Sequence, residues 1–213
     1  MNPRILSLAG LVSILTGLLL VLWWGLMSTM VPAGSDNLLL EMVRNSNWTT
    51  INILGSLHAV FLPLALLGIY ACQIEEVKTV GIVGFLLAFL GSIFFAWIQV
   101  EETLLWPLLA THAPVLIDMN GPMFADPAFY GTYLLMGVLF IPGTLILGIV
   151  TARARVLPRW GGILLAVGAP LFGIGGLLLP VRTVGAVLFT AALIWLGIAL
   201  IKRATATTTT VTG

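Results

Sequence analysis

Charged residues are scarce in this sequence, and their scarcity excludes an ordinary soluble domain. Asp, Glu, Lys and Arg together make up 8% of the 213 residues, whereas apolar residues make up 60%. A soluble domain carries roughly 25% charged residues, which cover its water-facing surface. Because this chain lacks the side chains for such a surface, we expect lipid to be the solvent around most of it.

Cysteine and histidine are almost absent as well. The single cysteine, Cys72, excludes both an intramolecular disulfide and a cysteine-based metal cluster. The sequence also has no basic run, no Gly-x-Ser-x-Gly motif and no glycine-rich phosphate loop. It therefore gives no support to a nucleic-acid-binding protein, a serine hydrolase or an ATPase.

Long apolar runs dominate what remains. A helix needs roughly 20 apolar residues to cross the ~30 Å hydrocarbon layer, and within lipid each backbone polar group must be bonded inside its own segment. The runs show no strand-like alternation, so the sequence predicts an all-α, polytopic membrane helix bundle. We expect one transmembrane domain over residues 1–203 and a disordered tail over 204–213. The six predicted spans cover about residues 5–27, 51–72, 79–100, 130–152, 160–180 and 183–201.

The distribution of positive charge predicts the orientation of these spans. With both termini cytoplasmic, only Arg44 and Arg182 of the nine Lys and Arg residues lie outside. Six of the eight acidic residues also fall outside and give that face a negative field. We therefore expect a multi-pass protein of a cell membrane, most simply the bacterial cytoplasmic (inner) membrane. The basic residues predicted to lie inside are Arg4, Lys78, Arg153, Arg155, Arg159, Lys202 and Arg203.

Two outer segments and one span have features of their own. Leu104 to Ile117 is apolar but too short to cross the membrane, which predicts an interfacial or re-entrant helix between spans three and four. Asp36 is placed to cap a second short interfacial helix. The third span carries small residues at steps of four, which predicts close packing against a neighbouring helix. These small residues are Gly84, Ala88, Ser92 and Ala96.

One inner link has a recognisable sequence, Val156-Leu157-Pro158-Arg159-Trp160-Gly161. Together with the long outer segment after the first span and the short charged loop after Cys72, it resembles a family of uncharacterised bacterial six-helix membrane proteins. That family is a domain of unknown function of the DUF4386 type. The resemblance implies a six-helix bundle and a bacterial source, and it implies no activity, cofactor or catalytic residue.

The polar residues with the most chemistry gather, by topology, in the predicted outer half. His58 lies inside the second span and His112 lies in the outer segment, while Glu101 and Glu102 end the third span. An ionisable residue inside a span is costly and so suggests a role, although a neutral histidine can also simply bond a neighbouring helix. The predicted ligand-binding residues are His58, Gln99, Glu101, Glu102 and Trp106, and the predicted metal ligands are His58, Glu101, Glu102 and His112.

Three functions remain open on the sequence. The first is binding or transport of a small molecule or cation through an outward-facing site with an acidic mouth. The second is a membrane enzyme or redox protein that holds a divalent metal or, less favoured, a haem between the histidines. The third is an accessory or structural subunit whose partners are lipid and protein. A polar cavity that reaches the bundle centre would favour transport. His58 within ligand distance of Glu101, Glu102 or His112 would favour the enzyme or redox protein. A dry core with both glutamates in solvent would favour the accessory subunit.

Overall fold

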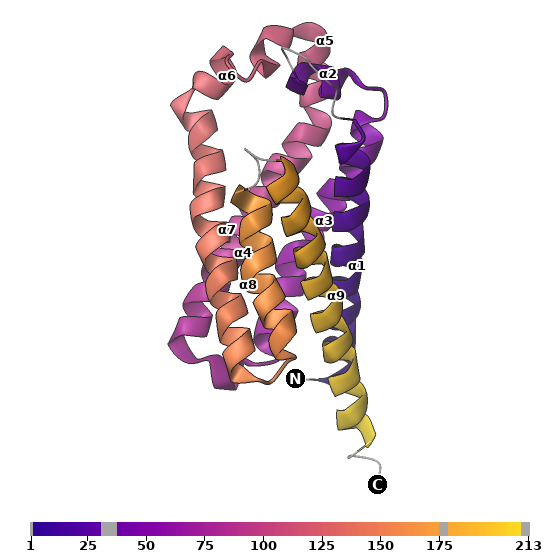
Figure 1. Ribbon diagram of the computed structural model, residues 1–213, viewed down its shortest axis with the longest axis vertical. Helices are drawn as coiled ribbons and strands as arrows, with labels where there is room; N and C mark the ends of the chain where they lie inside the picture. Colours follow the sequence, from indigo (N-terminus) through magenta and orange to yellow (C-terminus); the bar gives the residue numbers. More distant parts are fainter. Residues whose placement is uncertain (1, 31–37, 175–178, 210–213) are drawn as a thin grey trace.

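A computed structural model of the protein describes residues 2–30, 38–174 and 179–209, and these segments hold helices and no β-strand (Figure 1). The prediction of an all-α fold is therefore confirmed. The helices are α1 (Pro3–Ser28), α2 (Leu38–Arg44), α3 (Trp48–Ala71), α4 (Ile74–Leu104), α5 (Trp106–His112), the 3-10 turn η1 (Pro114–Ile117), α6 (Pro122–Ala125), α7 (Pro127–Ala154), α8 (Arg159–Ile174) and α9 (Leu179–Thr209).

Helices α1, α3, α4, α7, α8 and α9 run side by side along the long axis of the molecule (Figure 1). Each packs against two others, in the order α1, α3, α4, α7, α8 and α9, and α9 closes the ring on α1. Both ends of the drawn chain lie at the same end of the bundle, which we call the terminal end. An even number of helices that alternate in direction brings both termini to one end, as the predicted topology with both termini on the same side requires.

Five of these helices are long and apolar enough to cross a membrane: α1, α3, α7, the continuous stretch Ile74–His112 and Leu179–Ala206. The chain is thus a multi-pass membrane protein. The fifth predicted span, 160–180, is shorter than expected. Its helix α8 has 16 residues and extends only about 24 Å. Leu179 and Pro180 belong to α9 instead, and residues 175–178 lie outside the described segments.

The tail prediction also needs correction, because α9 continues as helix to Thr209. Ala204 is 4% exposed, so packing still supports the helix beyond the predicted end of the span. Helix formation is cooperative, and an existing helix is extended at low cost once its first turns are formed. The predicted disorder of residues 204–209 is therefore wrong; residues 210–213 lie outside the described part.

The short helices α2, α5 and α6 form a cap across the end of the bundle opposite the terminal end (Figure 1). Trp106 and Ala110 of α5 and Ile117 of η1 are buried in this cap, which explains why the segment is so apolar. The cap lies across the helix ends, as expected of an interfacial segment, and α5 does not turn back between the helices. Asp36, the predicted helix cap, lies outside the described residues.

The small-residue stripe of α4 packs against α7, as predicted. A Cβ on Gly143 of α7 would overlap the backbone nitrogen of Ala88, and a Cβ on Gly84 would come within 2.6 Å of the Ile146 side chain. The two backbones therefore touch in the terminal half of the bundle. A Cβ on Gly91 would likewise overlap the Phe140 nitrogen, so this contact continues along α4.

Candidate functional site

A cavity of about 750 Å³ lies between α4, α7, α8 and α9, in the half of the bundle nearer the cap. Its lining is mostly apolar, but it includes five polar side chains from three helices. Gln99 and Glu102 come from α4, one helical turn apart, so the helix geometry alone places them on one face. The other three are Tyr130 and Tyr133 of α7 and Arg182 of α9.

Glu102 is the acidic group of the cavity. Its carboxylate is half-buried and accepts a hydrogen bond of 3.1 Å from the Tyr133 hydroxyl, across the gap between α4 and α7. Within the described residues Tyr133 is the one donor to this carboxylate. A carboxylate can accept several hydrogen bonds, so Glu102 keeps the capacity to receive a donor from a bound molecule.

Arg182 is the basic group of the cavity, and it is held by aromatic rings. Its guanidinium carbon lies 4.6 Å from the ring centre of Trp24, 4.8 Å from that of Phe172 and 5.9 Å from that of Trp23. Such cation–π contacts stabilise a guanidinium but satisfy none of its N–H donors. Within the described segments Arg182 makes neither a hydrogen bond nor an ion pair, and its buried Nε has no partner.

A cluster of phenylalanine rings closes the inner end of the cavity. The ring centres of Phe95 and Phe172 are 6.2 Å apart, and Phe140 lies 6.3 Å from Phe95. Phe189 of α9 lies 6.1 Å from Phe140 and 6.5 Å from Phe172 and completes the cluster. The cavity therefore ends at an apolar floor made by these rings.

Gln99 connects the cavity to a buried hydrogen-bond network centred on Asn52 of α3. The Gln99 side-chain amide donates to Asn52 Oδ1 over 2.9 Å, and the Trp23 indole donates to the same oxygen over 3.2 Å. The Asn52 amide in turn donates to the Trp48 carbonyl over 3.0 Å. These bonds join α1, α3 and α4 behind the cavity wall and fix Gln99 and Trp23, two of the side chains that shape the site.

His58, the central predicted ligand, does not line the cavity. Its ring is fully buried, and Nδ1 lies 2.9 Å from the Thr16 carbonyl oxygen of α1. The rings of Phe95 and Phe189 pack against it at 6.0 and 6.3 Å, so Phe95 stands between His58 and the cavity. Nε2 has no partner among the described residues. The geometry favours a helix-packing role for His58.

The other predicted residues are divided between the cavity and the cap. Trp106 is buried in the cap and stacks on Trp48, with ring centres 6.1 Å apart. Glu101 is half-buried beside Glu102 but does not line the cavity, and His112 is exposed on α5.

The predicted metal site is not assembled in the described structure. His58, Glu101, Glu102 and His112 are not brought together, and among the described residues no group of three or more His, Cys, Asp or Glu side chains could hold a metal ion. His58 lies in the bundle core and His112 on the cap, so they do not face each other as axial haem ligands would.

Sequence reasoning found Gln99 and Glu102 but missed Tyr133 and Arg182. Arg182 was assigned to an outer loop, yet it lies within α9, in the first turns of a long apolar helix. A charge placed in such a helix is itself a signal of function. Tyr133 follows Tyr130 at helical spacing in an otherwise apolar span, a weaker signal.

No protein-family model, curated protein or solved structure matches this chain in the three comparisons made. The resemblance to the DUF4386-type family therefore stays a prediction, and the site has to be interpreted from its own geometry.

Proposed function

We propose that the cavity binds a small amphipathic molecule whose polar end carries both a hydrogen-bond acceptor and a donor. The observation that supports this most is Arg182, a half-buried side chain whose Nε is buried and has no hydrogen-bond partner among the described residues. A buried N–H donor without an acceptor is costly, and a ligand carboxylate or phosphate would supply that acceptor. Glu102, in the same cavity, would receive an ammonium or hydroxyl donor from the same molecule.

The apolar part of the ligand is inferred from the walls. The phenylalanine floor accepts an aliphatic or aromatic group, and the rim includes exposed apolar side chains of α7 and α8. Leu134 is 56% exposed, Val138 58% and Ile174 55%. In a membrane these side chains face lipid, so the ligand enters sideways from the bilayer.

This proposal modifies the first of the functions that the sequence left open. The predicted acidic mouth favoured cations, but Arg182 offsets the charge of Glu102, so a zwitterionic or dipolar molecule fits better. The phenylalanine floor favours binding over an open pore, and transport would require those rings to move. We propose that the cavity lies on the outer side of a bacterial cytoplasmic membrane, because the positive charges of the loops favour the opposite side as the cytoplasmic one.

The proposal is tested with three phenyl probes of similar size: phenylpropylamine, phenylpropanoate and phenylalanine. Each is titrated into the purified protein in nanodiscs of zwitterionic lipid, and binding is measured by calorimetry. Phenylalanine, which carries both groups, should bind most tightly. Arg182→Gln should weaken the two carboxylate probes about tenfold or more, and Glu102→Gln should weaken the two amine probes similarly, because each loses a charge-assisted hydrogen bond of about 1.5–3 kcal/mol.

Matched controls separate this effect from a general loss of charge. Glu101→Gln removes the neighbouring carboxylate outside the cavity, and Arg44→Gln removes an exposed arginine of the cap; both should leave binding unchanged. Arg182→Lys should partly restore carboxylate binding if the charge itself matters. If none of the probes binds saturably, or if both cavity variants bind all three like the unmodified protein, the proposal is wrong.

A further inference from the structure

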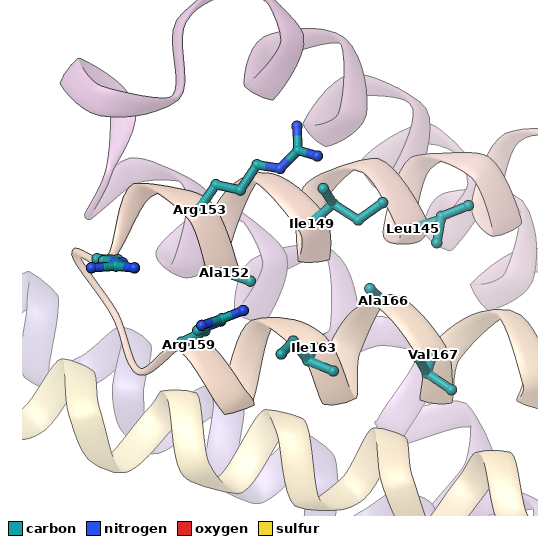
Figure 2. Close-up of a pocket in the computed structure, with 9 residues that line it drawn as sticks. Leu145, Ile149, Ala152, Arg153, Arg159, Ile163, Ala166 and Val167 are labelled. Atoms are coloured by element: carbon teal, nitrogen blue, oxygen red, sulfur yellow. The ribbon is translucent and has the colours of Figure 1, made fainter.

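A second hollow, separate from the cavity, lies between α7 and α8 near the terminal end (Figure 2). Its volume is about 530 Å³, and three arginines line the end of the groove nearest the α7–α8 link. Arg153 belongs to the last turn of α7, Arg155 ends that helix, and Arg159 begins α8. We call this hollow the arginine groove.

The three guanidinium groups are available to a ligand. All three side chains are exposed, and within the described residues none of them makes a hydrogen bond or an ion pair. The link that carries them is nevertheless fixed. Arg155 adopts a left-handed conformation with φ of 54°, and the Arg203 side chain of α9 donates a hydrogen bond of 2.6 Å to the Val156 carbonyl. Three positive charges thus lie at one end of the groove, and none of them has an acidic partner in the described part of the chain.

The rest of the groove is lined by apolar residues. It is deep because glycine and alanine at its bottom are smaller than the side chains on its walls. A Cβ on Gly148 would overlap the backbone of Ala166, and a Cβ on Gly162 would come within 2.5 Å of the Ala152 nitrogen, so the two helices touch there. Ala152 and Ala166 form the floor at this contact (Figure 2). The larger side chains beside the floor form the walls, and they are Leu145, Ile149, Ile163 and Val167.

The charged residues lie at one end of the groove, and the apolar residues lie along the rest of its length. Figure 2 shows Arg153 and Arg159 near the link, while Leu145 and Val167 lie farther along the same two helices, toward the middle of the bundle. The exposed fractions of Leu145 and Val167 are 40% and 44%, so the walls are open to lipid on one side. An elongated molecule with an anionic head and an apolar chain matches both parts at once.

We propose that the arginine groove binds an anionic phospholipid of the surrounding leaflet. The phosphate and its anionic headgroup lie against Arg153, Arg155 and Arg159, and one acyl chain lies along Ala152 and Ala166. Guanidinium groups bind phosphate oxygens in a bidentate manner, and basic pockets between membrane helices on the cytoplasmic side suit anionic headgroups. The positive charge distribution predicts that this end is cytoplasmic, where anionic lipid would be met.

The groove is tested by native mass spectrometry of the purified protein in detergent, titrated with phosphatidylglycerol or phosphatidylcholine of identical acyl chains. Phosphatidylglycerol should bind at least tenfold more tightly. Replacement of all three arginines by glutamine should abolish most of this preference, since each basic residue near an anionic lipid surface contributes a factor of about five. A variant R4Q/K78Q/K202Q removes the same number of charges from this end but none from the groove, and it should keep the preference.

Two further measurements separate the lipid from other ligands. Val167→Phe fills the apolar part and should weaken both lipids without removing a charge, and it stays informative if the triple arginine variant fails to fold. Glycerol phosphate, which has the head without the chains, should bind far more weakly than phosphatidylglycerol. Equal binding of the two lipids, a retained preference in the triple arginine variant, unchanged binding in Val167→Phe, or equally tight glycerol phosphate would each overturn the proposal.

Discussion

Gly143→Leu is expected to separate α4 from α7 and to destabilise the bundle by at least about 3 kcal/mol, the upper part of the range for overpacked cores. A side chain at this position would meet the backbone of Ala88, which cannot rotate away as a flexible side chain would. The loss should appear as a much lower unfolding midpoint of the detergent-purified protein, with a reduced yield of monodisperse material.

Gly131→Leu on the same helix is the matched control. Apart from the backbone of its own helix, no described atom lies within 4 Å of a Cβ built on Gly131, so the same substitution there should change the midpoint little. A similar midpoint for Gly143→Leu and the unmodified protein would show that α4 and α7 are not in backbone contact. Since the cavity lies between these two helices, the same variant should also lose probe binding.

Asn52→Leu is expected to be the most harmful change among the polar residues of the core. Leucine has a similar size but removes one acceptor and two donors, which leaves the Trp23 indole and the Gln99 amide without their partner. Side-chain hydrogen bonds between membrane helices contribute about 0.6–1.7 kcal/mol each. Asn52 makes three such bonds, with the Trp23 indole, the Gln99 amide and the Met27 sulfur, so their loss should cost about 2–5 kcal/mol of unfolding free energy, measured by denaturation in mixed micelles.

Thr144→Val provides the comparison for Asn52. Thr144 is also fully buried, but its hydroxyl donates only to the carbonyls of Phe140 and Ile141 in its own helix, which keep their helical partners without it. This substitution should cost less than about 1 kcal/mol. Equal effects of the two substitutions would mean that the bonds from Asn52 to α1 and α4 do not stabilise the bundle. Asn52→Leu should also weaken probe binding, since Gln99 would no longer be held in the cavity wall.

The sequence by itself determined the number of main helices and their approximate limits. Apolar length decides whether a segment can cross a bilayer, and this property is local, so it can be read without knowing what a helix packs against. The close packing of the small-residue stripe from Gly84 could be predicted for the same reason, because residues at steps of four lie on one face of any helix. The same reasoning failed at the end of α9, where burial of Ala204 extends the helix past the apolar run.

The site was decided by tertiary structure. Glu102 and Arg182 are 80 residues apart, and the sequence gives no sign that α4 and α9 present them to one cavity. His58 and Glu102 looked equivalent in the chain as isolated polar residues in or beside apolar spans. Which one faces a cavity depends on the rotation of each helix about its axis, and that rotation is set by contacts with several neighbours at once. Local composition therefore determined the helices, whereas non-local packing determined which of their few polar groups meet.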